Sequence, residues 1–282
     1  MTELAGKTFL ITGANTGIGK ITARELLRQG AHVVLACRSR EKTEPVVAEL
    51  RREAGHDRIE HVALDLGDLA SVRACAAALL ARELPIHGLI NNAGLAGQRG
   101  LTQDGFEVQF GTNHLGHYLF TRLLLERITA SGPARIVNVS SASHYNAPRI
   151  DWDALRQKTR TVTAMREYAV SKLANVLFTK ALARRLDASR VTAYALHPGV
   201  VATDVWRRVP APVRWLMKQF MITPEEGARA SLVCATAPEL AGQTGRYYDV
   251  GGVERRPSRL AEDAALAEEL WRRSAEWTGL PA

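Results

Sequence analysis

The sequence predicts an α/β protein, a single domain over residues 1–282 with a doubly wound parallel sheet of about seven strands flanked by helices. Short apolar segments typical of buried strands alternate with helical patterns from one end of the chain to the other. A glycine-rich turn joins the first predicted strand to the first predicted helix. No internal repeat, linker or low-complexity segment interrupts this alternation. These observations favour one continuous sheet over several small units.

The composition indicates a folded protein without a membrane span. Hydrophobic residues make up 46% of the chain, and no apolar run approaches the roughly 20 residues of a membrane-spanning helix. The first residues do not resemble a secretory signal. Cys37, Cys75 and Cys234 are widely spaced, which predicts neither a disulfide framework nor a metal site and indicates a cytoplasmic location. The formal net charge is +8, but the basic residues are scattered among acidic ones, so no nucleic-acid partner is expected.

The first strand, Thr8–Thr12, leads into a candidate phosphate-binding turn at residues 13–20, and the helix that follows ends at Gly30. Glycines let the backbone approach a pyrophosphate, and the helix N-terminus offers N–H groups and a positive dipole end. The spacing is G-x-x-x-G-x-G, not the commoner G-x-G-x-x-G, but the strand–turn–helix context is the required one. An ordinary glycine-rich turn is the alternative. The candidate binding residues are Gly13, Asn15, Thr16, Gly17, Ile18 and Gly19.

The second strand, residues 32–37, is followed directly by Arg38. An acidic residue usually stands at this position in NAD sites, where it binds the ribose 2′-hydroxyl. An arginine can form a charge-assisted pair with the 2′-phosphate of NADP. NADP(H) is therefore expected in preference to NAD(H). Residues 41–54 read as an exposed helix that follows this strand.

The third and fourth strands, residues 59–64 and 86–91, also end in candidate cofactor contacts. Asp65 comes where the adenine of a dinucleotide could meet a side chain, although structural capping of the turn is nearly as plausible. Asp68 is expected to cap the next helix, which runs to Leu80. The segment after the fourth strand could likewise be only a turn. The candidate contacts are Asp65, Leu66, Asn91, Ala93 and Gly94.

A long helix is expected over residues 104–128, with an apolar face wide enough to be buried between the sheet and another subunit. Asn113 lies inside it, where asparagine is unfavourable by propensity. A buried asparagine needs hydrogen-bond partners. Asn113 is therefore either a structural polar anchor or part of a proton path.

The fifth strand, residues 134–141, ends in two serines at the sheet edge where open α/β sheets hold ligands. Residues 142–163 are polar and irregular, as expected for the rim of a substrate cleft. The helix that follows carries Tyr168 and Lys172 four residues apart, on one face. A nearby cation lowers the pKa of a phenol from its usual value of about 10, so the pair could exchange a proton with a substrate oxygen. A common exposed pair on a helix is the alternative.

The last third of the chain continues the alternation. The sixth strand is expected at residues 191–196 and the seventh at 245–250, with helices from Thr223 to about residue 237 and over 259–278. Residues 205–222 break the pattern with an apolar and basic segment. We expect a lid over an apolar substrate first, packing against the core second and peripheral membrane contact third.

The chain resembles the short-chain dehydrogenase/reductase family, whose motifs appear here in the family's order over about four-fifths of the sequence. They are Thr12 with residues 13–19, Asp65, residues 91–94, Asn113, Ser141, Tyr168 with Lys172, and Pro198 with Gly199. Residues 35–38, 113–117, 171–178 and 223–228 are similar to the retinol-dehydrogenase-like branch. The resemblance implies a Rossmann-type fold and an NADP(H)-dependent oxidoreductase for small apolar alcohols, aldehydes or ketones. It also implies a homodimer or homotetramer formed through the two long helices.

The resemblance further implies a catalytic set of Asn113, Ser141, Tyr168 and Lys172. Ser141, rather than Ser140, holds the substrate oxygen, and Tyr168 exchanges the proton. Lys172 lowers the pKa of Tyr168 and binds the nicotinamide ribose, while Asn113 holds a water that passes protons to Lys172. Further cofactor contacts are expected from Tyr168, Lys172, Pro198, Gly199, Val200 and Thr203. No metal is expected. A non-catalytic NADP(H)-binding protein with a redox-sensing or regulatory role is the alternative.

Overall fold

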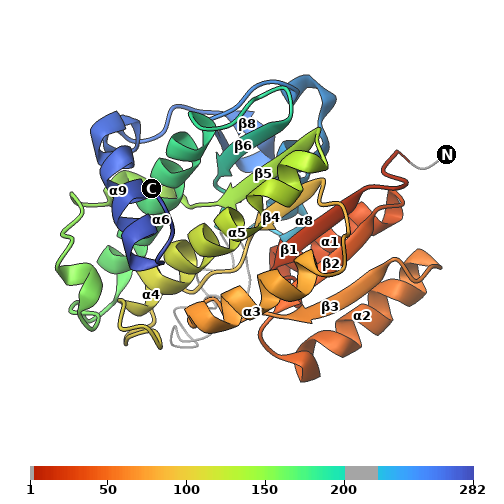
Figure 1. Ribbon diagram of the computed structural model, residues 1–282, viewed down its shortest axis with the longest axis horizontal. Coiled ribbons are helices and arrows are strands. Elements are labelled where there is room, and N and C mark those ends of the chain that lie inside the picture. The colour runs from red at the N-terminus through yellow and green to blue at the C-terminus, as the bar shows by residue number, and fades with distance from the viewer. Residues whose placement is uncertain (1–2, 201–221) are drawn as a thin grey trace.

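The computed structural model describes residues 3–200 and 222–282 of the chain (Figure 1). Thr203 and nearly all of the predicted lid at 205–222 lie outside the described residues. Ile222, the last residue of that segment, is described, and its N–H donates to the carbonyl oxygen of Val200, with 3.0 Å between the two atoms.

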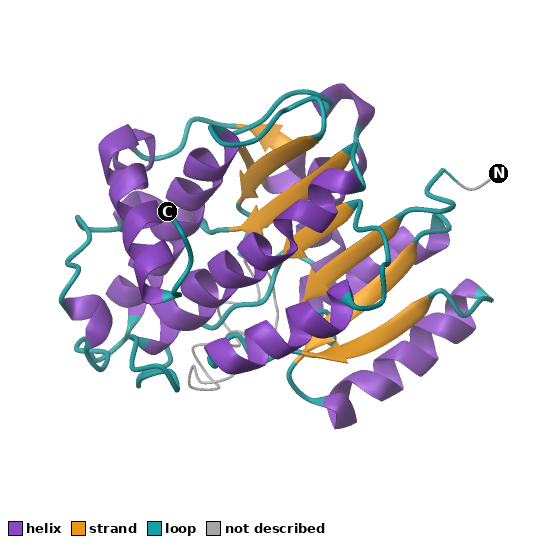
Figure 2. Ribbon diagram, viewed as in Figure 1, coloured by secondary structure: helices purple, strands orange, loops and turns teal. Residues whose placement is uncertain are grey.

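Eight strands form one twisted sheet with helices on both faces (Figures 1 and 2). Their order is β3-β2-β1-β4-β5-β6-β7-β8, and all neighbouring pairs are parallel except β7 with β8. The predicted α/β class and parallel sheet are thus confirmed. The strands are β1 (Thr8–Thr12), β2 (His32–Cys37), β3 (Ile59–Ala63), β4 (Gly88–Asn91), β5 (Ala134–Val139), β6 (Val191–Leu196), β7 (Arg246–Asp249) and β8 (Val253–Glu254).

The helices bury apolar side chains against the two faces of the sheet, giving one hydrophobic cluster on each face. α1 (Gly17–Arg28), α2 (Arg40–Ala54) and α8 (Pro224–Thr236) cover one face. The other face is covered by α3 (Leu69–Leu80), α5 (Gly116–Ala130) and α6 (Met165–Ala183), with α9 (Ala264–Trp277) packed outside them. Within the described parts of the chain, no helix has both the length and the apolar character needed to cross a membrane.

The eighth strand was not predicted. β8 is only two residues long and pairs antiparallel with β7, after a turn in which Gly251 and Gly252 have φ of 76° and 83°. Two residues are too few for an alternating pattern to show in a sequence. The expected count of about seven therefore describes the parallel part of the sheet.

The helix expected over residues 104–128 begins later than predicted and is not regular. Gly105 has φ of 76°, which an α-helix cannot accommodate, and Glu107 caps the short helix α4 (Val108–Phe110) by accepting from the N–H groups of Gln109 and Phe110. A π-helical turn at Gly111–Leu115 then precedes α5. Asn113 lies in this turn, a type of distortion that is frequent at functional sites.

The predicted cap at Asp68 is confirmed, and the helix predicted to start at Thr223 also begins with a cap. Asp68 accepts hydrogen bonds from the N–H groups of Ala70 and Ser71 at the start of α3. Thr223 and Glu226 form a reciprocal capping box at the start of α8.

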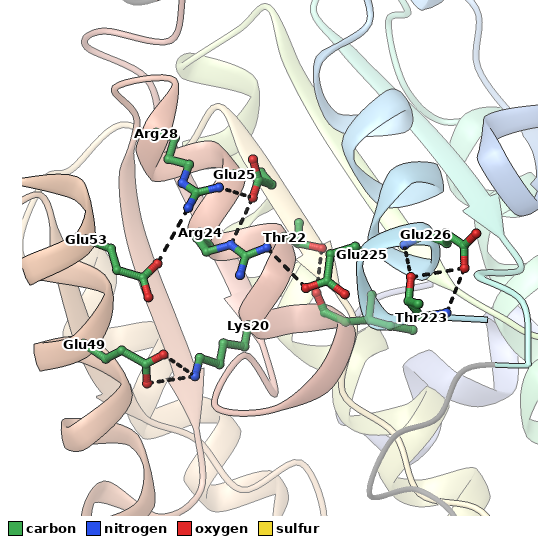
Figure 3. Close-up of polar contacts among 11 residues, drawn as sticks. Lys20, Thr22, Arg24, Glu25, Arg28, Glu49, Glu53, Thr223, Glu225 and Glu226 are labelled. Atoms are coloured by element: carbon green, nitrogen blue, oxygen red, sulfur yellow. Dashed lines mark hydrogen bonds and ion pairs between the residues drawn. The ribbon is translucent and has the colours of Figure 1, made fainter. Parts of the chain in front are cut away.

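Ion pairs hold α1 between α2 and α8 (Figure 3). The ammonium of Lys20 lies 2.7 Å from the carboxylate of Glu49 on α2. The guanidinium of Arg24 lies 3.3 Å from the carboxylate of Glu225 in the first turn of α8. The start of α8, where the described chain resumes, is therefore attached to the helix that follows the glycine-rich turn.

Candidate active site

A cavity of about 350 Å³ opens at the carboxyl ends of the central strands. The strand order reverses between β1 and β4, and ligands of open α/β sheets bind at such a switch point. Among the described residues the cavity is lined by the glycine-rich turn, the segments after β4, β5 and β6, and the first turns of α6. The lining residues that the sequence predicts as cofactor contacts or catalytic groups are Gly13, Asn15, Thr16, Gly17, Ile18, Gly19, Ala93, Gly94, Ser141, Tyr168, Lys172, Pro198, Gly199 and Val200.

The glycine-rich turn has no room for side chains at two of its positions. A Cβ atom on Gly19 would lie 2.5 Å from the amide nitrogen of Asn92 and 2.8 Å from the carbonyl oxygen of Gly13. Gly13 has φ of 65°, and a Cβ there would lie 2.8 Å from that of Ala93. The backbone thus forms a bare cradle at the N-terminus of α1, which fits the pyrophosphate of a dinucleotide.

The two asparagines after β4 have different surroundings. The side chain of Asn91 is buried behind the sheet edge and donates to Thr121 Oγ1 and Asn138 Oδ1, so it does not line the cavity. Asn92 lines the cavity, and its amide donates to the carbonyl oxygens of Thr12 (2.9 Å) and Gly13 (3.3 Å). Asn92 therefore holds the glycine-rich turn in place, a role that the sequence reading did not assign.

Tyr168 and Lys172 lie together in the first turns of α6. The ammonium nitrogen of Lys172 is 5.7 Å from the centre of the Tyr168 ring. Burial raises the pKa of Tyr168, and a hydrogen bond with the side chain of Ser141 opposes the rise. The net shift is thus opposite to the lowered pKa expected from the sequence, because desolvation of the phenolate dominates, and a lowering effect of Lys172 stays a prediction. Tyr168 is a neutral phenol, the form that donates a proton.

Lys172 is buried but keeps donors for a ligand. Its side chain is 3% exposed, and its ammonium donates to the carbonyl oxygen of Val139 over 3.0 Å. A lysine carries three donors, and this is the single hydrogen bond that the described residues make with them. Burial lowers its pKa to about 8. At neutral pH the cavity thus contains a cation with free hydrogen-bonding capacity.

The burial of this cation makes a measurable prediction for Lys172→Met. The folded chain releases the Lys172 proton near pH 8, whereas the unfolded chain keeps it until about pH 10.5. Between these values the unfolded state binds more protons at Lys172, so the contribution of Lys172 to the free energy of unfolding rises with pH. We expect the free energy of unfolding of the wild type, minus that of the methionine variant, to increase by up to about 3 kcal/mol over this range. Denaturant titrations at pH 7 to 10 measure it, and a difference independent of pH contradicts it.

The structure distinguishes the two serines after β5. Ser140 is 2% exposed, and its hydroxyl donates to the main-chain carbonyl of Lys172 over 2.7 Å. Ser141 is less buried and lies beside Tyr168, and its Oγ accepts from the N–H of Ser143 at 3.2 Å. Ser140 thus links β5 to α6. The Ser141 hydroxyl lies in the cavity and shares a hydrogen bond with Tyr168.

Asn113 is fully buried beside the cavity and joins three segments. Its amide donates to the carbonyl oxygen of Leu95 and to Ser171 Oγ, both at 3.0 Å, and its Oδ1 accepts from the N–H of Leu95. Ser171 in turn donates to the carbonyl oxygen of Tyr168. A Cβ on Gly94 would lie 3.4 Å from both Asn113 Oδ1 and Lys172 Nζ, so these groups flank the same backbone. Asn113 is thus a polar anchor next to the candidate proton donor.

The residues expected around the adenosine end lie outside the cavity. The side chain of Arg38 is 72% exposed, and its guanidinium lies 3.9 Å from the carboxylate of Asp65. Asp65 also accepts from the N–H of Gly67, so the predicted turn capping is present. Leu66 is buried beneath α5, where a Cβ on Gly116 would meet its carbonyl oxygen.

Metal ligands do not cluster in the parts of the chain that the structure describes: no group of three or more His, Cys, Asp or Glu side chains there could hold an ion. Cys37, Cys75 and Cys234 are free and buried.

The sequence reading also missed two buried histidines that contact the candidate catalytic residues. His117 contacts the main chain of Asn113, and His144 contacts that of Ser141. The sequence signals are their positions, four residues after Asn113 and three residues after Ser141, and for His117 also its place in the segment 113–117.

Comparison with known proteins identifies the class to which this site belongs. The short chain dehydrogenase profile matches residues 7–152. Retinol dehydrogenase 13 of Homo sapiens is 44% identical over 291 residues, covering 99% of this chain and 86% of that protein. Retinol dehydrogenase 12 of Homo sapiens is 45% identical over 282 residues, covering 99% and 88%. These matches show an oxidoreductase that acts on CH–OH donors. Within that class, the chain belongs to the short-chain dehydrogenase/reductase family, in its retinol-dehydrogenase-like branch.

Solved structures agree with this assignment. A protein from Mycobacterium paratuberculosis has a TM-score of 0.77 at 36% identity, covering 99% of this chain and 96% of that chain. A protein from Beutenbergia cavernae, determined with bound NADP, has a TM-score of 0.72 at 27% identity, covering 88% and 96%. The family binds nicotinamide cofactors, which fits the bare cradle at the start of α1.

Proposed function

We propose that the chain is an NADP(H)-dependent oxidoreductase that interconverts a small apolar alcohol and its aldehyde or ketone, with Tyr168 as general acid–base group. The observation that carries the proposal is the arrangement of Ser141, Tyr168 and Lys172 in the cavity that the glycine-rich turn also lines. The nicotinamide, when bound, supplies or accepts the hydride. An apolar substrate is supported by the retinol dehydrogenases among the relatives and by Leu95 and Val200 in the cavity wall.

The side chains of the cavity bind the substrate oxygen, transfer the proton and bind the cofactor ribose. The hydroxyls of Ser141 and Tyr168 hold the substrate oxygen, and Tyr168 donates its proton during reduction or removes one during oxidation. Lys172 binds the cofactor's ribose hydroxyls with the donors that Val139 leaves free. The side chain of Asn113 already has protein partners. Its main-chain carbonyl oxygen accepts from His117 and keeps a second lone pair, which would hold a water on the path to Lys172.

The preference for NADP(H) rests on Arg38. Arg38 lies between β2 and the N-terminus of α2. Its guanidinium has only a long contact with the carboxylate of Asp65. It can pair with a 2′-phosphate, whereas an aspartate would repel one. We expect Arg38→Asp to change the ratio of kcat/KM with NADPH to kcat/KM with NADH by at least about tenfold toward NADH, about 1.4 kcal/mol. Arg40→Asp, whose arginine pairs with Glu44 on α2, is the matched control. An unchanged ratio in Arg38→Asp would remove Arg38 from cofactor selection.

A turnover screen tests the proposal directly. The purified wild type is incubated with NADPH or NADH and a panel of aldehydes and ketones of increasing chain length, and oxidation of the cofactor is followed by absorbance. Turnover that improves with apolar chain length supports the proposed function. Tight NADPH binding without turnover of any substrate would instead favour the redox-sensing or regulatory alternative.

The assembly state, single-domain organisation and cytoplasmic location expected from the sequence stay predictions. A dimer or tetramer through the outer faces of α5 and α6 would have to accommodate α9. Trp271 of α9 lies against Tyr118 of α5 and Phe178 of α6, with ring centroids 5.2 and 6.0 Å apart. An assembly of this chain would therefore use α9 or another surface.

A further inference from the structure

His117 connects the candidate cofactor turn with the π-helical turn of Asn113. Its Nε2 lies 2.8 Å from Thr12 Oγ1, and its Nδ1 lies 3.0 Å from the main-chain oxygen of Asn113. Thr12 Oγ1 accepts from the N–H groups of Asn92 and Ala93, both at 2.9 Å. One imidazole ring thus joins the end of β1 and the segment after β4 to α5.

The partners of His117 determine its protonation. A carbonyl oxygen only accepts, so Nδ1 carries a hydrogen and donates to Asn113. The two lone pairs of Thr12 Oγ1 already accept two N–H groups, so its hydroxyl hydrogen is directed to Nε2. The ring is therefore a neutral imidazole in a single tautomer. Burial agrees with this, because it lowers the pKa of His117 to about 4.

His144 makes the same kind of contact with Ser141, in the segment after β5. Its Nδ1 lies 2.7 Å from the main-chain oxygen of Ser141, and its Nε2 accepts from the N–H of Ser258 at 3.1 Å. The N–H of Ser258 can only donate, which again places the hydrogen on Nδ1. The ring is fully buried and in contact with Tyr145 and Tyr247.

We infer that His117 and His144 are positioning residues, two neutral imidazoles whose Nδ1–H groups hold the main chains of Asn113 and Ser141 in place for the reaction. The inference rests on the proposed function. It adds that each ring works through one directed hydrogen bond: His117 ties Asn113 to the cofactor turn, and His144 ties Ser141 to the segment before η7 (Arg259–Glu262). Displacement of catalytic groups by about 1 Å can cost about a hundredfold in rate.

Substitutions by asparagine and by glutamine test the two ring nitrogens, Nδ1 and Nε2, separately. An asparagine carries its amide on Cγ, where His117 has Nδ1, so His117→Asn keeps a donor for Asn113 and loses the partner of Thr12. A glutamine carries its amide one bond further, so His117→Gln keeps a partner for Thr12 and loses the donor for Asn113. We expect His117→Gln to lower kcat by about 10- to 100-fold with an unchanged Kd for NADPH. His117→Asn should instead keep kcat within about threefold and weaken NADPH binding by at least about threefold.

The same pair of substitutions at His144 provides a second test should a His117 variant fail to fold. His144→Gln should lower kcat by about tenfold or more, and His144→Asn should restore it to near the wild-type value. The control is His114, because it is equally buried in the π-helical turn but contacts Ser274 of α9 through Nε2. His114→Asn and His114→Gln should change the melting temperature and leave kcat unchanged.

Measurements of kcat, KM, the Kd for NADPH and the melting temperature for all six variants decide the inference. Equal losses of kcat in the asparagine and glutamine variants of His117 and His144 would overturn it, as would equal losses in the His114 controls. A wild type that turns over no substrate would contradict the proposed function instead. The Kd values of the two His117 variants would then still test the Thr12 end of the ring.

Discussion

Replacement of Tyr168 by phenylalanine is expected to abolish most of the turnover and leave cofactor binding intact. The phenol is the neutral acid of the cavity, because burial raises its pKa and the Ser141 hydrogen bond only partly opposes this. Its removal takes away the proton donor but not the ring, so the shape of the cavity is retained. We expect kcat to fall by about 10² to 10⁴, the contribution typical of general acid–base catalysis. The Kd for NADPH should stay within about twofold, since the cradle of the cofactor lies elsewhere.

Tyr145→Phe is the matched control for this variant. Tyr145 lies in the 3₁₀ turn after Ser141, within the segment 142–163 that is expected to form the rim of the cleft, and its hydroxyl donates to the carbonyl oxygen of Arg256 over 2.6 Å. The control removes the same atom from a neighbouring tyrosine and should keep kcat near the wild-type value. Near-wild-type turnover in Tyr168→Phe would exclude Tyr168 as the proton donor. A comparable loss in both variants would mean that the assay reports rim packing rather than proton transfer.

The sequence predicts the central part of this fold well because buried parallel strands are nearly continuous apolar runs. The predicted bounds of β1 and β6, residues 8–12 and 191–196, agree with the structure. The prediction is wrong where tertiary contacts decide. The periodicity of residues 104–128 cannot distinguish an α-helix from a π-helical turn, which here coincides with the hydrogen bonds of Asn113 to Leu95 and Ser171. The antiparallel strand β8 is too short to leave a pattern.

For the candidate site, sequence spacing predicts which groups share a helix but not what surrounds them. Tyr168 and Lys172 lie four residues apart, so their proximity follows from helix geometry. The direction of the Tyr168 pKa does not, because it depends on how much of the phenol is removed from water. The roles of the two positioning histidines likewise cannot be predicted from spacing, because their partners are distant in sequence. His117 bonds to Thr12 and His144 to Ser258, partners more than one hundred residues away.

Replacement of Gly19 by alanine is expected to weaken cofactor binding more than any other small change in the turn. The added Cβ would lie 2.5 Å from Asn92 Nδ2, 2.8 Å from the Gly13 oxygen and 2.9 Å from Ala14 Cα. Two of these atoms belong to the backbone of the cradle, so the turn itself must shift. The Asn92 amide would also leave its acceptors, the carbonyl oxygens of Thr12 and Gly13. Overpacking of this kind costs about 1–3 kcal/mol. We expect this strain to fall on the turn geometry that binds the cofactor, which corresponds to a rise of at least about fivefold in the Kd for NADPH.

Gly88→Ala separates this local effect from a general loss of stability. Gly88 begins β4, at the end of the strand opposite to the cavity, and an added Cβ would collide with the ring of Phe9 on β1. The control should therefore lower the melting temperature without changing the Kd for NADPH, because its strain is relieved inside the sheet. Isothermal titration of folded protein with NADPH, beside thermal unfolding, measures both quantities. If Gly19→Ala bound NADPH as tightly as Gly88→Ala does, the pyrophosphate could not lie on the turn between β1 and α1, and the cofactor placement proposed above would be lost.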